Sequence, residues 1–136
     1  MSIEFDGLDE ILAQLDGIVD EKKLEMALGK ACAIVEAEAK KKAPKGDGAL
    51  RNSIASRVEG GEGIVYTPLE YAPYVEYGTG LFAEVSGRKD VPWRYQDEKG
   101  EWHITSGMPP HPYMRPSLEE NRDKITEILR EGLLNG

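Results

Sequence analysis

The chain has 136 residues and a formal net charge of −8, with 40% hydrophobic and 31% charged residues. This length and composition are typical of one folded domain and exclude a largely disordered chain. The longest apolar run, residues 31–35, is too short for a membrane-spanning helix of roughly 20 residues, and the excess of acids argues against tight binding to nucleic-acid phosphates.

Residues 1–18 are predicted to form an N-terminal arm. Ile3 and Phe5 alternate with polar residues, and a weak amphipathic helix follows through Leu8, Ile11, Leu12 and Leu15 as far as Gly17. The first residues are acidic and lack the basic and then apolar order of a secretion signal, so the chain is expected to start in a cytoplasm.

A long helix is predicted from Asp20, as the N-cap, to about Lys42. Three lysines at its end complement the helix dipole, and Pro44 prevents continuation. Its apolar stripe consists of Leu24, Ala27, Leu28, Ala31, Ile34 and Val35. Cys32 lies within this pattern and is expected to be a small buried residue and no nucleophile.

Strand signals follow a flexible connector at residues 44–50. Residues 53–58 alternate and residues 64–67 are β-branched and aromatic, with a glycine-rich turn between them, which predicts a hairpin. Residues 71–77 fit either an extended strand or a short helical turn. A second hairpin is predicted from residues 93–96 and 102–105, joined by residues 97–100.

The end of the chain combines a rigid segment with a helix. Four prolines between residues 108 and 116 predict an extended conformation. A helix is expected from about Pro116 to Leu134, with a capping box formed by Ser117 and Glu120. One face of this helix carries Leu118, Ile125, Ile128, Leu129 and Leu133.

Together these elements predict an α+β fold within a single domain, residues 1–136. We expect an antiparallel sheet of about four strands, packed by the long helix of the N-terminal half and by the C-terminal helix, with an inserted loop and hairpin.

The aromatic residues concentrate in the middle of the chain. All six tyrosines, both tryptophans and Phe82 lie between residues 66 and 113. Beside glycine and proline loops, such residues either form a protein interface or complete the core of the sheet, and the sequence leaves both readings open.

Catalytic, metal and cofactor signals are weak. His103 and His111 have no neighbours at metal-ligand spacing, and no motif marks Ser106, His111 and Glu76 as a triad. Residues 78–80 lack the Lys-Ser/Thr that follows a phosphate-binding loop. We therefore expect no enzyme, metal or cofactor. The enzymatic rival is a small cell-wall glycan hydrolase with Glu70 and Glu76 as paired carboxylates, which Gln substitutions would test.

Three stretches in order resemble the small minor tail proteins of tailed bacteriophages. They are Ala43-Pro44 with Gly48-Ala49-Leu50-Arg51-Asn52-Ser53-Ile54, then Tyr71-Ala72-Pro73-Tyr74-Val75-Glu76-Tyr77-Gly78-Thr79, then Pro112-Tyr113-Met114-Arg115-Pro116-Ser117-Leu118. Asp47 stands where the family usually has Thr or Ser, and residues 82–106 look like a variable insertion. In the first stretch, Leu50 and Ile54 are expected in the core, and Arg51 is expected to lie at the surface or to pair with an acid.

The resemblance implies a tail-completion or tail-terminator protein at the head-tail junction of a virion, assembled in the bacterial cytoplasm. Its partners would be copies of itself in a ring of six, the tail tube protein and the head connector or stopper, with DNA passing through the lumen without specific binding and no membrane contact. The neighbouring connector or stopper ring is the alternative. The interface is expected to include Tyr71, Tyr74, Glu76, Tyr77, Gly78, Thr79, Gly80, His111, Tyr113, Met114 and Arg115.

Overall fold

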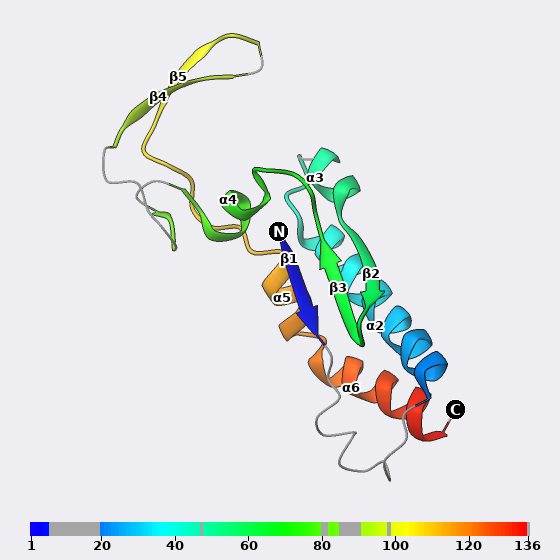
Figure 1. Ribbon diagram of the computed structural model, residues 1–136. Helices are drawn as coiled ribbons and strands as arrows, with labels where there is room; N and C mark the ends of the chain where they lie inside the picture. The colour runs from blue at the N-terminus through cyan, green and yellow to red at the C-terminus, as the bar shows by residue number, and fades with distance from the viewer. Residues whose placement is uncertain (6–19, 47, 80–81, 85–90, 98, 136) are drawn as a thin grey trace. The chain divides into compact units, whose positions relative to one another are not determined.

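The computed structural model describes residues 1–5, 20–46, 48–79, 82–84, 91–97 and 99–135 (Figure 1). Contacts divide the chain into two compact units. The first unit comprises residues 1–69 and 113–136, and the second comprises residues 70–112.

Both units mix helix with antiparallel sheet, which confirms the predicted α+β class. The first unit contains β1 (Ser2–Phe5), α2 (Glu21–Lys42), α3 (Gly48–Ser53), β2 (Ala55–Glu59), β3 (Glu62–Tyr66), α5 (Met114–Glu119), α6 (Arg122–Arg130) and the π-helix η2 (Glu131–Asn135). The second contains α4 (Ala72–Tyr77), β4 (Trp93–Gln96) and β5 (Trp102–Thr105). The strands form a three-stranded and a two-stranded sheet.

Helix α2 forms the centre of the first unit and confirms the predicted long helix. The Asp20 carboxylate accepts hydrogen bonds from the backbone N–H groups of Lys22 and Lys23, at 2.9 and 3.3 Å, as an N-cap does. The buried face of the helix packs on β2 and β3 and also on α5, α6 and η2. This face consists of Ala27, Leu28, Ala31, Cys32, Val35 and Ala39.

The three-stranded sheet has the order β1-β3-β2, and all of its strands are antiparallel. The turn between β2 and β3 uses Gly60 and Gly61 at positive φ, so the first predicted hairpin is confirmed. Gly63 lies on the sheet face toward α2, where an added Cβ would come within 2.7 Å of both Cys32 Sγ and Phe5 Cζ. A larger residue at position 63 would therefore displace the side chains of Cys32 and Phe5.

Two local predictions need correction. Residues 48–53 form the short helix α3 instead of a connector running into a strand. Complete burial of Leu50 and the hydrogen bond from Ser53 Oγ to Leu50 O at 2.6 Å stabilise this turn, so the strand starts later, at Ala55. Leu50 and Ile54 lie in the core, as expected.

The C-terminal helix begins before the predicted Pro116, at Met114, and it is interrupted. Ser117 Oγ donates to Met114 O, and Asn121 Nδ2 donates to Ser117 O at 2.8 Å. Because Ser117 lies inside α5 and bonds backward, it does not form the predicted capping box. The break separates α5 from α6, whose buried residues Ile125 and Leu129 belong to the predicted apolar face.

The predicted helix at residues 8–17 lies outside the described residues, whereas the alternation of Ile3 and Phe5 corresponds to β1. Within the described part of the chain, each helix is either too short or too polar to span a lipid bilayer.

Candidate functional site: the second unit

The second unit brings together two of the stretches that the sequence singled out. Thr79 N donates to Met108 O at 2.9 Å, and Met108 N donates back to Thr79 Oγ1 at 2.8 Å. His111 N donates to Val75 O at 2.8 Å. The end of α4 is thereby tied to the proline-rich segment, and the stretch at residues 71–77, left open by the sequence, is a short helix.

Gly78 makes this close approach possible. Its φ of 83° lies in the left-handed region, and an added Cβ would come within 2.9 Å of Met108 O, Phe82 O and Pro110 Cδ. Two of these three atoms are backbone carbonyl oxygens, which cannot move aside as a flexible side chain can. Glycine at position 78 is thus required by the close approach of the backbone segments.

The predicted interface residues divide by exposure. Tyr71, Tyr74 and His111 are exposed, while Tyr77, Thr79 and Arg115 are partly exposed. Glu76, Gly78, Tyr113 and Met114 are buried within the chain, and Gly80 lies outside the described residues. The exposed members are the ones that a partner can reach without rearrangement.

Strands β4 and β5 pair in the register Trp93 with Thr105 through Gln96 with Trp102, which confirms the second predicted hairpin. One face carries Tyr95 stacked on His103, with ring centroids 5.3 Å apart. The other face carries Trp102 and Ile104, with the Arg94 guanidinium 5.1 Å from the centre of the Trp102 ring. A two-stranded hairpin is marginally stable alone, so these faces gain from a partner.

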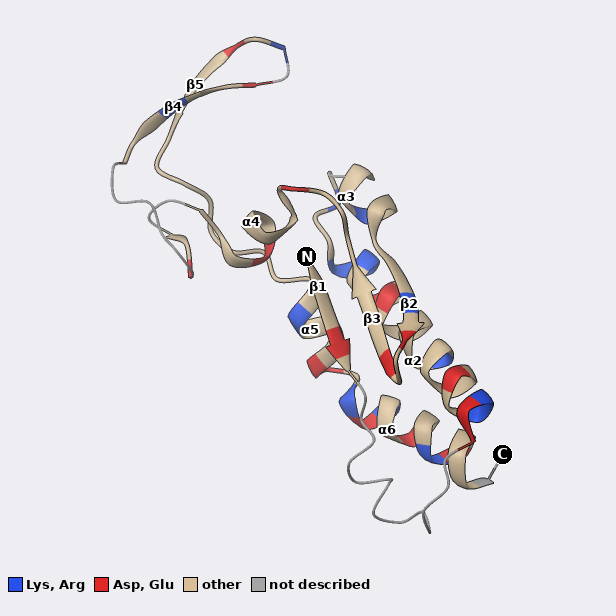
Figure 2. Ribbon diagram, viewed as in Figure 1, with Lys and Arg blue, Asp and Glu red and all other residues tan. Residues whose placement is uncertain are grey.

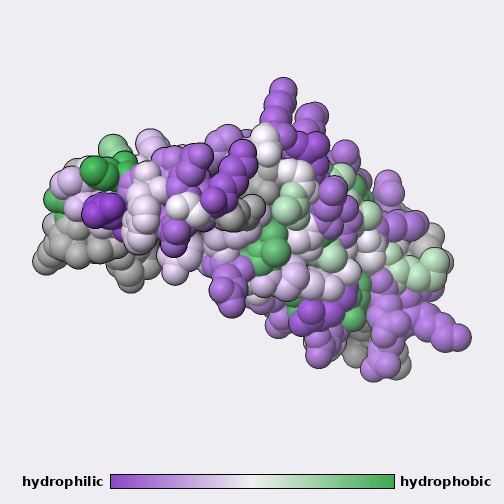
Figure 3. Space-filling model, turned by 90° about the horizontal axis from the view of Figure 1, so that it is seen from above, coloured by the Kyte–Doolittle hydropathy of each residue, from purple (hydrophilic) through white to green (hydrophobic). Residues whose placement is uncertain are grey.

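Among the described residues, large hydrophobic side chains reach the surface mainly in the second unit. Figure 3 shows one face of the molecule, on which hydrophobic residues form separate green spots among hydrophilic ones. Of the nine exposed large hydrophobics among the described residues, seven belong to this unit, although it contains about a third of the chain. They are Tyr71, Tyr74, Phe82, Tyr95, Trp102, Ile104 and Met108. The exposures reach 60% for Tyr74 and 72% for Ile104, so these residues do not complete a core. Exposed apolar side chains of this kind are candidates for contacts with other proteins.

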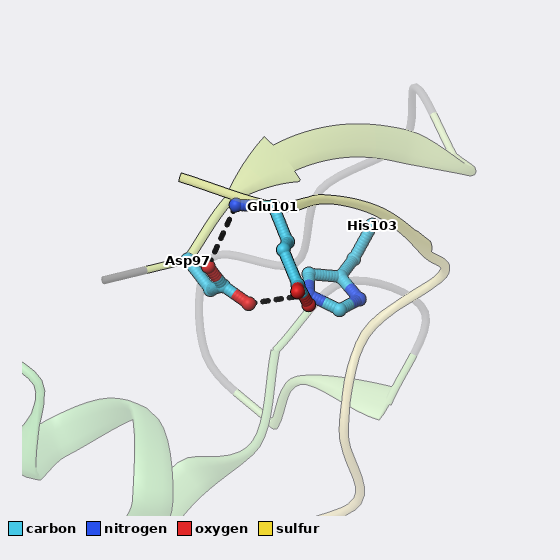
Figure 4. A group of neighbouring side chains, drawn as sticks. All are labelled: Asp97, Glu101 and His103. Carbon is cyan, nitrogen blue, oxygen red and sulfur yellow. Dashed lines mark hydrogen bonds and ion pairs between the residues drawn. The ribbon is translucent and has the colours of Figure 1, made fainter. Parts of the chain in front are cut away.

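The loop between β4 and β5 holds a cluster that sequence reasoning missed. The ligand atoms of Asp97, Glu101 and His103 lie within 4.8 Å of one another (Figure 4). Asp97 Oδ2 is hydrogen-bonded to His103 Nε2 at 2.7 Å, and Asp97 Oδ1 accepts the backbone N–H groups of Lys99 and Glu101. The D-x3-E-x-H spacing across a predicted hairpin turn was the available signal.

These three side chains have the donor types that bind divalent cations, but the cluster is also complete without one. The Asp97 carboxylate and the His103 imidazole already hydrogen-bond to each other, and the carboxylate also accepts the backbone N–H of Lys99 in the turn. We therefore assign the cluster a structural role in the hairpin. The hydrogen bond from His103, followed by those from the backbone, lowers the pKa of Asp97.

We expect the pKa of the Asp97 carboxyl group to rise toward its ordinary value when His103 is replaced by Gln, because the strongest hydrogen bond to the ionised form is weakened. Carboxyl ¹³C chemical shifts measured against pH give the midpoint directly. Since the folded pKa is depressed, the stabilisation that Asp97 gives the turn is lost as the pH falls through that pKa. An unchanged midpoint in the variant would contradict the assigned role.

The two candidate catalytic carboxylates differ in exposure. Glu76 is fully buried whereas Glu70 is exposed, so the two carboxylates are not presented together to a glycan. Cys32 is buried, its Sγ lies 3.7 Å from Arg57 O, and burial raises the pKa of its thiol. A thiol held in its protonated form is a poor nucleophile, as expected for this position.

Comparison with protein families gave one match. A family model described as "Bacteriophage HK97-gp10, putative tail-component" matches residues 6–78, just over half of the chain. The matched range includes the first of the three stretches and the second as far as Gly78, together with β2, β3 and α4. The comparisons with curated proteins and with solved structures gave no match.

Proposed function

Because the chain belongs to the HK97-gp10-like family of bacteriophage tail components, we propose that it is a structural protein of the virion that caps the tail tube and joins it to the head. In this role it forms a ring, with six copies as the expected number, and ends tube polymerisation by covering the last ring of tube protein. The free energy of binding to these partners is sufficient for capping and joining, and no chemical step is required.

The concentration of exposed hydrophobic side chains in the second unit carries this proposal. Aromatic anchors bury much surface at low entropic cost, and they dominate the energetics of many protein interfaces. The first unit, by contrast, has a buried core between the sheet and the helices, so it supplies a stable base. A chain with one well-packed unit and one unit rich in exposed apolar side chains suits a subunit that docks on larger assemblies.

A terminator ring needs contacts of three kinds: to copies of itself, to the tube protein and to the connector or stopper of the head. The outer strands β1 and β2 each leave one edge without a strand neighbour among the described residues. These edges and the aromatic surface of the second unit are separate features. They can therefore serve lateral and axial contacts in the same particle.

The negative net charge of the chain fits a channel through which DNA passes without being bound. Six copies at −8 each would carry −48 in total. Acids that face the lumen would repel phosphates and let the genome slide through without sticking. Neutralising such acids is expected to slow DNA exit.

Electron microscopy of particles made without this gene tests the proposed role. We expect DNA-filled heads beside separate tails of abnormal length, because neither capping nor joining takes place. Separate tails of normal length would favour the neighbouring connector or stopper ring instead. Intact, joined particles would exclude a role at the junction.

A further inference from the structure

The two outer strands of the three-stranded sheet run in the same direction. Strands β1 and β2 lie on either side of β3 and both pair with it antiparallel, so they are parallel to each other. Within the described part of the chain, the outer side of each has no strand neighbour. Neither strand contains proline or lysine, residues that commonly block an exposed edge. Such an edge can accept a further strand.

The hydrogen bonds between β1 and β3 fix which backbone groups of β1 point outward. Met1 and Thr67 exchange both of their backbone hydrogen bonds, at 3.2 and 3.0 Å. Hydrogen-bonded and non-hydrogen-bonded pairs alternate along an antiparallel ladder. The N–H and C=O groups of Ser2 and Glu4 therefore point away from β3, to the free edge of β1.

The same alternation determines the free edge of β2. Ile64 lies between the β3 residues that bond to β1, so it bonds to β2, where its partner is Arg57. The N–H and C=O groups of Ser56 and Val58 consequently point away from β3. Each edge thus presents two residues with outward backbone groups, separated by one residue.

The two edges carry opposite charges on one face of the sheet. Glu4 of β1 and Arg57 of β2 both pair with Ile64, so their side chains point to the same face, and both are exposed. In the ribbon of Figure 2, β1 is partly red and β2 partly blue. Arg57 Nε donates to Glu59 Oε2 at 3.0 Å, but a guanidinium has five N–H donors, so it can bind a second carboxylate.

We propose that β1 of one copy adds in parallel to the free edge of β2 of the next copy, which makes a continuous sheet the lateral contact of the ring. The inference rests on the proposed ring and supplies its contact residues. In the register that uses the outward backbone groups, Glu4 N–H donates to Ser56 O of the next copy, and Glu4 O accepts from its Val58 N–H. This register places Glu4 beside Arg57, where opposite charges stabilise the pair.

The same register also joins apolar side chains. Phe5 of one copy lies beside Val58 of the next, on the face toward α2, and both are only half-buried in the single chain. Because the two edges are different surfaces, the contact is head-to-tail and repeats in one direction, as a closed ring requires. The rival contact, β2 against β2 about a two-fold axis, would stop at a dimer.

A disulfide between Ser2→Cys and Ala55→Cys tests this contact. Both residues pair with Tyr66 from opposite sides, so within one chain they lie two strand spacings apart, about 9–10 Å, which is beyond the reach of a disulfide. In the proposed register, Ser2 of one copy lies directly beside Ala55 of the next. Mild oxidation of the double variant is expected to give covalent oligomers up to the closed ring, and a mixture of the two single variants should stop at a covalent dimer.

Controls and contrary outcomes are separate for the contact and for the role. Each single variant alone should stay unlinked, as should the unmodified chain, whose Cys32 is 2% exposed. Dimers of the Ala55→Cys variant alone would assign the β2 edge to a two-fold contact and overturn the proposal. Joined particles made with the double variant, but without a disulfide between copies, would overturn this contact and leave the role at the head-tail junction standing.

Exchange of the two charges gives a second measurement. Glu4→Arg or Arg57→Glu alone places like charges side by side, and each is expected to weaken self-association about fivefold, measured by sedimentation velocity. Both changes in one chain restore opposite signs between copies, so association should return. Glu62→Arg is the matched control, because Glu62 is an exposed acid on the central strand β3. Association that stays weak when both charges are exchanged would also contradict the contact.

Discussion

Replacing Gly78 with alanine is expected to loosen the second unit more than any other single methyl addition at a described glycine. The residue has φ 83° and ψ 174°, a region that side-chain-bearing residues avoid at a cost of about 1–3 kcal/mol. The new Cβ would also lie 2.9 Å from Met108 O and Phe82 O, and overpacking of this kind costs typically about 1–3 kcal/mol more.

Hydrogen exchange at the amides of Thr79 and His111 measures this loosening. Both amides bond across the two segments that Gly78 brings together. A loss of about 2 kcal/mol corresponds to exchange that is roughly thirty-fold faster, and we expect at least that.

Gly100 supplies the matched control for this substitution. It has the same φ of 83°, but the nearest atom to an added Cβ is Gln96 Nε2 at 3.5 Å, an ordinary contact. Alanine at Gly100 therefore carries the backbone strain without the clash. If alanine at Gly78 were no more disruptive than alanine at Gly100, the close approach of the two segments would not be what requires glycine.

Replacing both Trp102 and Ile104 with alanine is expected to abolish assembly while the first unit stays folded. These neighbours on one face of β5 are 59% and 72% exposed, so the chain alone gains little from them. Truncating an aromatic anchor in an interface costs about 2 kcal/mol or more, which corresponds to association at least about thirty-fold weaker.

Complementation of the gene deletion measures this effect, as the titre of infectious particles formed when the variant is supplied in its place. Alanine at Met26 is the control, because Met26 is 66% exposed on α2, outside the second unit. Urea unfolding of the two purified variants should agree with that of the unmodified chain for the first unit. A normal titre with the double variant would remove this face from the proposed interface.

Helices and strands were predicted best where the residues that determine their ends lie within the same short segment. The N-cap at Asp20 and the lysines before Pro44 mark both ends of α2, because capping and the helix dipole act within one or two turns. The strands β4 and β5 were predicted with their observed bounds, since a polar turn between alternating segments is also a local pattern.

Predictions failed where side chains distant in sequence decide. Complete burial of Leu50 turns residues 48–53 into α3, and such burial depends on contacts that no local pattern displays. Tertiary packing overrides local preference there. At Ser117 the competing interaction is itself local, because Ser117 Oγ bonds back to Met114 O three residues earlier and the residue lies inside the helix instead of capping it.

The candidate site shows the same division. The sequence located the aromatic segments and the two stretches around Gly78 and His111, but it could not separate exposed side chains from buried ones. Tyr74 and Tyr113 have the same chemistry, yet Tyr74 is exposed and Tyr113 is fully buried.

By itself, the sequence determined the α+β class, the long helix, the two hairpins and the resemblance to phage tail proteins. Periodicity, caps and short motifs depend only on residues that are close together in the chain. Only the tertiary structure decided that the chain forms two units and that Gly78 lies against the proline-rich segment. Each of these depends on which residues, far apart in the chain, come together once water is excluded, and the free energy of that burial is a property of the whole fold.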